Sequence, residues 1–96
     1  MNGTTRNIVV IGCRGRMGAM LARRWTEAGH NVTGLDLPLT DEAFAASLPG
    51  ADVVMLCIPA GALAEVLPNL CRHLDGRQIL ADITSVKIRP VMQLEA

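Results

Sequence analysis

The chain has 96 residues, enough for one small domain and too few for two, since domains typically hold about 100–150 residues. Half of the residues are hydrophobic and 19% are charged, so a packed core is expected rather than disorder. Nine basic residues balance nine acidic ones, and Trp25 and Phe44 are the only aromatic residues, so neither charge nor base stacking favours a nucleic-acid partner.

The cysteines and the apolar stretches indicate a cytoplasmic protein. Cys13, Cys57 and Cys71 are odd in number and lack C-x-x-C spacing, which predicts neither a disulfide framework nor a zinc site. The longest uncharged stretch, 53–64, contains proline and glycine and is shorter than the roughly 20 residues of a membrane-spanning helix. We therefore expect reduced thiols, no metal, and no membrane or nucleic-acid partner.

Short apolar strands alternate with helical segments along the chain. Runs of β-branched and apolar residues predict four strands, over 7–12, 31–36, 52–58 and 78–83. Apolar residues at helical spacing predict the helices, over 17–28, 40–48, 63–74 and, at the end of the chain, within 86–95. Gly29 and the Asp75-Gly76 pair are typical stop signals for the first and third of these helices, and Thr40 or Asp41 is the expected cap of the second.

This alternation predicts an α/β fold, a Rossmann-like parallel sheet with helices on both faces. Four strands amount to about half of a dinucleotide-binding fold, for which the expected strand order is 3-2-1-4. A doubly wound domain normally continues past this point. We therefore expect residues 1–96 to form one dinucleotide-binding domain, truncated relative to the complete fold, as the front part of a longer enzyme.

The segment VVIGCRGRMG is a strand that runs into a glycine-rich turn and opens a helix. Free amides at a helix N-terminus bind anions, and glycine lets the backbone approach them. In this interpretation Gly12 supplies the turn, Gly15 the close approach to a diphosphate, and Gly18 the tight packing of helix on strand. The predicted cofactor-binding residues are Gly12, Cys13, Arg14, Gly15, Arg16, Met17 and Gly18. A plain strand-to-helix loop is the alternative.

The side chains of this loop leave several questions open. Cys13 occupies the first glycine position of the G-x-G-x-x-G pattern, so a positive φ there would strain it. Arg14 and Arg16 either reach a cofactor phosphate or are solvated surface charges. Met17 and Met20 lie at helical spacing, which favours core positions for their side chains over cofactor contacts.

Asp36 ends the second predicted strand, eighteen residues beyond Gly18. An acidic side chain at this place accepts hydrogen bonds from the adenosine ribose and repels a 2′-phosphate. Leu37 and Pro38 offer that phosphate neither a hydroxyl nor a guanidinium, so the expected cofactor is NAD rather than NADP. The alternative is a turn-forming aspartate before Pro38.

Two further segments follow the third and fourth predicted strands, at the edge where open α/β sheets bind ligands. The backbone of Ile58, Pro59 and Ala60 is expected to line the cofactor cleft, unless these residues form an ordinary turn. Thr84 and Ser85 place hydroxyls where the nicotinamide would lie, and each is equally a candidate helix N-cap.

The other candidate side chains favour structural roles. His30 is expected in a turn between helix and strand, His73 near a helix C-terminus, and Cys57 as a small buried hydrophobe rather than a nucleophile. The sequence contains no evident catalytic triad, metal cluster or carboxylate pair.

Three segments, VVIGCRGRMG, DVVMLCIPAGAL and ILADITSVKIRPVM, together resemble the amino-terminal part of bacterial prephenate dehydrogenases, a family that includes arogenate dehydrogenases. The resemblance implies NAD-dependent oxidative decarboxylation of prephenate to 4-hydroxyphenylpyruvate, in tyrosine biosynthesis. Gly15, Gly18 and Asp36 match cofactor positions of the family. Ser85 matches a serine that positions the substrate hydroxyl beside the nicotinamide, so it is expected both in catalysis and in cofactor binding.

The resemblance also implies parts that these 96 residues do not contain. The family's proton-accepting histidine follows the D-x-x-S-V-K motif, and a helical carboxyl-terminal domain forms a homodimer. The chain alone is therefore expected to bind NAD without turnover, and the substrate, prephenate or arogenate, stays open. Two alternatives remain: a related β-hydroxyacid dehydrogenase, and a non-catalytic module that senses NAD.

Overall fold

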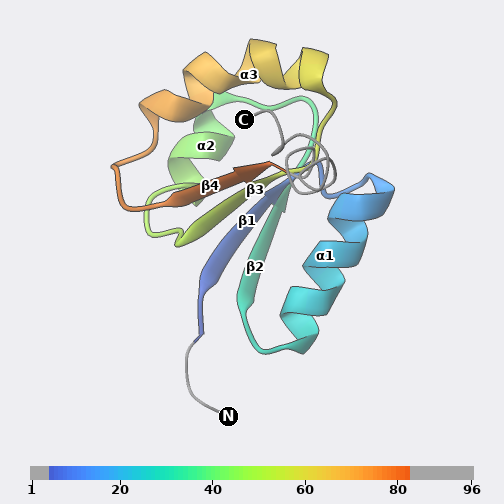
Figure 1. Ribbon diagram of the computed structural model, residues 1–96. Coiled ribbons are helices and arrows are strands. Elements are labelled where there is room, and N and C mark those ends of the chain that lie inside the picture. The colour runs from blue at the N-terminus through green and yellow to red at the C-terminus, as the bar shows by residue number, and fades with distance from the viewer. Residues whose placement is uncertain (1–4, 83–96) are drawn as a thin grey trace, which may run out of the picture.

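The computed structural model describes residues 5–82 (Figure 1). Strands and helices alternate as predicted, with boundaries that differ by a few residues. The elements are β1 (Asn7–Ile11), α1 (Arg16–Glu27), β2 (Asn31–Leu35), α2 (Asp41–Ser47), β3 (Val53–Leu56), α3 (Ala60–Arg72) and β4 (Ile79–Asp82). The helix expected within 86–95, and with it Thr84 and Ser85, lies outside the described residues.

Local signals end α1 and begin α2 where the sequence indicates, whereas α3 ends at Arg72 with His73 as its C-cap, before the expected stop at Asp75-Gly76. Gly29 has a φ of 101°, a left-handed conformation that glycine adopts without strain, and it follows the C-cap of α1. The hydroxyl of Thr40 accepts a 3.1 Å hydrogen bond from the amide of Ala43, which caps α2. The choice between Thr40 and Asp41 as cap is thus decided in favour of the hydroxyl.

All four strands are parallel, in the order β2-β1-β3-β4. The predicted order 3-2-1-4 is therefore wrong, because β3 pairs with β1 instead of β2. Burial explains the difference: no residue of β2 is fully buried, whereas Val54, Met55 and Leu56 of β3 are. A strand that is apolar on both faces is most stable inside a parallel sheet, and the more polar β2 tolerates its edge.

Helices cover both faces of the sheet (Figure 1). The chain moves to one side from β1 to β2 and back from β2 to β3, so right-handed crossovers place α1 and α2 on opposite faces. Phe44 of α2, the C-cap residue Leu48 and Leu70 of α3 are at most 1% exposed and pack with inward-facing residues of β1 and β3. The apolar stripe of α3 joins this core through Leu63, Val66 and Leu67, and Leu74, just after the helix, packs against it as well. The α/β class with helices on both faces is confirmed.

Within residues 5–82, no helix is long and apolar enough to cross a membrane. Because every strand runs in the same direction, the loops that follow β1, β2 and β3 lie at one edge of the sheet, the carboxyl edge.

Candidate functional site

The glycine-rich loop after β1 is fixed to the strands on both sides of it. The amides of Gly12 and Cys13 donate to the carbonyl of Leu35, at 2.7 and 3.2 Å, and the amide of Cys57 donates to the carbonyl of Ile11 at 2.7 Å. These bonds extend the parallel ladders past the ends of the strands. The loops after β1 and β3 and the end of β2 therefore form one continuous edge.

Gly12 makes the turn that the sequence assigned to it. Its φ is 96°, and a Cβ built there would lie 2.5 Å from the carbonyl oxygen of Cys57 and 2.9 Å from Cγ2 of Ile58. Among the described residues no side-chain-bearing residue has a positive φ. The strain considered for Cys13 is therefore absent, because the left-handed conformation falls on Gly12 instead.

Gly18 and Gly15 differ in how much room they have. A Cβ on Gly18 would lie 2.1 Å from the carbonyl oxygen of Gly12, a backbone atom that cannot move aside. A Cβ on Gly15 would meet only that same oxygen, at an ordinary 3.5 Å. The close packing of helix on strand predicted for Gly18 is therefore present, whereas the surroundings of Gly15 leave space above the loop.

The N-terminus of α1 is open. The first intrahelical hydrogen bond runs from the amide of Ala19 to the carbonyl of Gly15, at 2.8 Å, so the amides of Arg16, Met17 and Gly18 precede the hydrogen-bond ladder. Gly15 offers no side-chain cap, and the first turn of α1 contains no acidic residue. The positive end of the helix dipole is thus left for an anion.

Asp36 lies against the glycine-rich loop. Its Oδ2 accepts a 2.6 Å hydrogen bond from the amide of Arg14, and its Oδ1 accepts one of 2.7 Å from the amide of Leu37. These two backbone bonds, that of Arg14 first, lower the pKa of Asp36 below its ordinary value of 3.8; the Arg14 charge helps, and burial opposes the shift. The carboxylate is therefore ionised near neutral pH and next to the open end of α1.

The structure adds Gly34 to the residues that shape this edge. A Cβ built on Gly34 would lie 2.8 Å from Sγ and 2.9 Å from Cβ of Cys13, so the thiol rests directly on β2. The sequence reasoning missed this contact. A glycine inside a predicted strand is the signal that marks such a close approach.

The remaining predicted cofactor residues divide between core and surface. Ile58 is 5% exposed and belongs to the core, so only its backbone can face the edge. Pro59 is the exposed N-cap of α3, and Ala60 is the first residue of that helix. Met17 is 43% exposed, so the core position favoured for its side chain is wrong: helical spacing alone does not fix which side of the first turn faces the sheet.

The two imidazole side chains have the structural roles predicted for them, whereas Cys57, predicted to be buried, is only half-buried. Burial, and then the charge of Asp82, raise the pKa of the half-buried Cys57, which disfavours a reactive thiolate. His30 accepts a 3.0 Å hydrogen bond at Nδ1 from the amide of Arg6. His73 is the C-cap of α3, and its Nε2 lies 3.3 Å from Oδ1 of Asp41.

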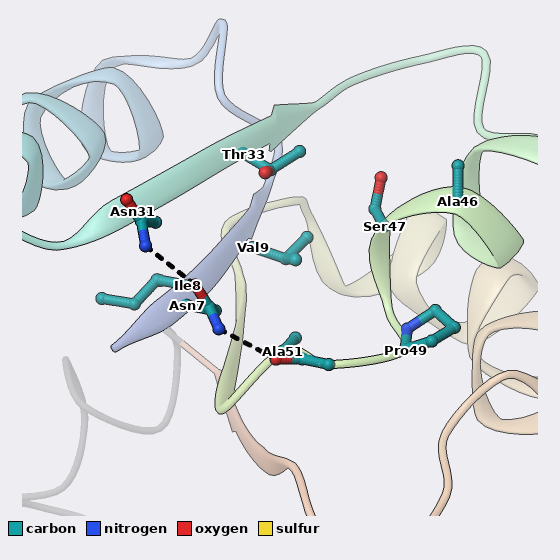
Figure 2. A pocket seen from close by; sticks show the side chains of 10 residues that line it. Asn7, Ile8, Val9, Asn31, Thr33, Ala46, Ser47, Pro49 and Ala51 are labelled. Atoms are coloured by element: carbon teal, nitrogen blue, oxygen red, sulfur yellow. Dashed lines mark hydrogen bonds between the residues drawn. The ribbon is translucent and has the colours of Figure 1, made fainter. Parts of the chain in front are cut away.

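A hollow of about 290 Å³ lies elsewhere, at the amino ends of β1 and β2 (Figure 2). Asn7 and Asn31 border it, and their side chains are occupied: Asn31 donates to Asn7 at 3.0 Å, and Asn7 donates to the carbonyl of Gly50 at 3.2 Å. Ligands of open α/β sheets bind at the opposite edge. This hollow is therefore separate from the candidate site formed by the glycine-rich loop and Asp36.

Residues 17–96 match the family model for the nucleotide-binding domain of prephenate dehydrogenase. The chain is 34% identical over 95 residues to the T-protein of Haemophilus influenzae, an alignment that covers 98% of this chain and 25% of that protein. The chain thus spans about a quarter of the length of this curated relative. A semialdehyde dehydrogenase NAD-binding protein from Cupriavidus necator, solved with calcium and NAD, has a similar fold: the TM-score is 0.70 at 18% identity, over 82% of this chain and 33% of that one.

Proposed function

The chain belongs to the family of prephenate dehydrogenase nucleotide-binding domains, and we propose that it binds NAD at the carboxyl edge of its sheet. The observation that carries this proposal is the 2.6 Å hydrogen bond between the amide of Arg14 and the carboxylate of Asp36. The bond holds the Asp36 carboxylate near a helix N-terminus that lacks both a side-chain cap and an acidic residue, which supports a role for this carboxylate as the acceptor of ribose hydroxyls.

The chemistry of the donor set fits a dinucleotide. The diphosphate would accept hydrogen bonds from the open amides at the start of α1, and the absence of a side chain at Gly15 allows it to come close. Asp36, held as an anion, would accept from the hydroxyls of the adenosine ribose. The same charge repels a 2′-phosphate, which favours NAD over NADP.

The proposed reaction of the whole protein is the oxidative decarboxylation of prephenate to 4-hydroxyphenylpyruvate. NAD, when bound, takes up the hydride that the substrate carbon releases while carbon dioxide leaves. In this proposal the hydroxyl of Ser85 positions the substrate. A further, helical domain supplies the base that accepts the hydroxyl proton and forms a homodimer. The T-protein relative, of which this chain spans 25%, leaves ample length for such a domain.

Calorimetric titration of the 96-residue chain with NAD and with NADP tests the cofactor proposal. We expect NAD to bind at least about tenfold more tightly than NADP, which corresponds to roughly 1.4 kcal/mol. Equal affinities would remove the role given to Asp36, and no binding of either cofactor would overturn the proposal.

The reaction is tested separately, with the parent protein and NAD. Reduction of NAD in the presence of prephenate or arogenate supports the assignment and decides between the two substrates. Reduction with a β-hydroxyacid alone would assign the related dehydrogenase class instead. NAD binding without turnover of any of these substrates would favour a sensing module.

The three free cysteines support a reducing compartment, which we propose to be the cytoplasm.

A further inference from the structure

We infer that Cys13 and Gly34 act as a positioning pair, whose contact sets the height of the glycine-rich loop above β2 and thereby the placement of Asp36 relative to the open end of α1. This inference rests on the proposed binding of NAD at that site. Through this contact the two residues act on the cofactor indirectly, by way of the Arg14 amide.

No side chain larger than a hydrogen atom fits at position 34 beside Cys13. A Cβ on Gly34 would lie 2.8 Å from Sγ and 2.9 Å from Cβ of Cys13, both well inside van der Waals distance. The sulfur can rotate away about χ1, but the Cβ is fixed to the backbone. Any side chain at position 34 must therefore lift the loop itself.

Lifting the loop would lengthen the hydrogen bonds that the amides of Cys13 and Arg14 donate. Along the loop, the amides of Gly12 and Cys13 share the carbonyl of Leu35, and the next amide, that of Arg14, donates to Asp36. The Cys13 bond, at 3.2 Å, is longer than that of Gly12, at 2.7 Å. Raising the loop at Cys13 therefore strains first the Cys13 bond and then the bond that connects the diphosphate loop to the ribose carboxylate.

The effect should stay local, because Gly34 belongs to the edge strand and is exposed. Gly34 pairs with Val10 in the register of β1 and β2. A Cβ built on Gly34 would come within 4 Å of side-chain atoms of Cys13 but of no core residue. A methyl group at this position thus disturbs the loop and leaves the core of α2, α3 and the sheet intact.

A size exchange in the full 96-residue chain tests the inference. Gly34→Ala is expected to weaken NAD binding about tenfold or more and NADP binding less, so that the preference for NAD narrows. Adding Cys13→Gly removes both clashing atoms, and the double variant Cys13→Gly/Gly34→Ala should recover NAD affinity to within about threefold of the wild type. Thr33→Ala, on the same strand but facing the hollow of Figure 2, is the matched control and should bind NAD like the wild type.

Amide exchange supplies a readout that does not depend on cofactor. The Arg14 amide, protected by its bond to Asp36, should exchange faster in Gly34→Ala and return to the wild-type rate in the double variant. In one outcome, the wild type binds NAD while the double variant recovers neither the NAD affinity nor the protection of the Arg14 amide. That result would overturn the inference about Cys13 and Gly34 and leave the cofactor assignment in place. The inference is also overturned if Gly34→Ala lowers the affinities for NAD and NADP by the same factor, or leaves both affinities unchanged. Failure of the wild type to bind NAD removes the proposed function itself, and the exchange rates then still decide whether the contact sets the loop.

Discussion

The amide of Arg14 donates a 2.6 Å hydrogen bond to Oδ2 of Asp36, twenty-two positions further along the chain. This bond joins the loop that would hold a diphosphate to the carboxylate that would hold a ribose. The distance between the two halves of the proposed site is therefore set before a ligand arrives, which lowers the entropic cost of binding.

Replacing Asp36 tests the charge at the end of β2. Asp36→Asn keeps the size of the side chain, but one of the two acceptor oxygens becomes an NH2 group, which only donates, and the negative charge is lost. We expect NAD affinity to fall about tenfold or more and the preference over NADP to narrow, as measured by calorimetry. Asp41→Asn, the same chemical change at the exposed start of α2, should leave both affinities unchanged. An Asp36→Asn variant that keeps the wild-type preference would contradict the prediction.

The lowered pKa of Asp36 predicts how its contribution to stability depends on pH. A carboxyl group with a lower pKa in the folded state stabilises that state above its unfolded pKa, here 3.8, and loses the contribution as pH falls through the folded value. The difference in unfolding free energy between wild type and Asp36→Asn should therefore be constant from about pH 7 to about pH 5 and shrink below pH 3.8. Urea titrations at several pH values measure it; a difference that grows on acidification would show the opposite linkage.

Alanine substitutions at Gly15 and Gly18, the two glycines at the start of α1, should have different effects on folding stability and on NAD binding. Gly18→Ala forces a methyl group onto the carbonyl of Gly12, 2.1 Å away, and should destabilise the fold by about 1–3 kcal/mol. Gly15→Ala meets only an ordinary contact at 3.5 Å, so its stability should stay within about 1 kcal/mol of wild type while NAD affinity falls. Thermal unfolding and calorimetry on both variants measure the two effects. A Gly15→Ala variant that binds NAD as tightly as the wild type would show that the space at Gly15 has no connection with the ligand.

The unfavourable charge at the start of α1 predicts a conflict between stability and binding. Arg16, the first residue of α1, opposes the helix dipole, so Arg16→Glu should stabilise the protein by about 0.3–1 kcal/mol at low salt and weaken NAD binding by repelling the diphosphate. Arg23→Glu makes the same charge change about two turns further along the helix and is the control, with a smaller effect on affinity. An Arg16→Glu variant that gains stability without any loss of affinity would place the diphosphate elsewhere.

Sequence reasoning recovered the elements and the turn at Gly12, because both depend on local signals. Periodicity and β-branching located β1 and α1, and a glycine at position 12 was sufficient to predict the turn. Sequence reasoning failed on the strand order, which depends on where β3 finds neighbours on both sides. It also failed on Met17, whose exposure depends on how α1 packs on the sheet. The contact between Cys13 and Gly34 was also missed, because it joins two segments far apart in the sequence.

The amino-acid sequence by itself determined that strands and helices alternate, that a glycine-rich turn opens α1, and that an acidic residue follows β2. These features arise from the conformational preferences of neighbouring residues, which act over a few positions. Only the tertiary structure decided that β1 lies between β2 and β3, and that the carboxylate of Asp36 meets the amide of Arg14. Both depend on how buried strands pair across long sequence separations, and such pairing is selected by the burial of the whole sheet and not by any single segment.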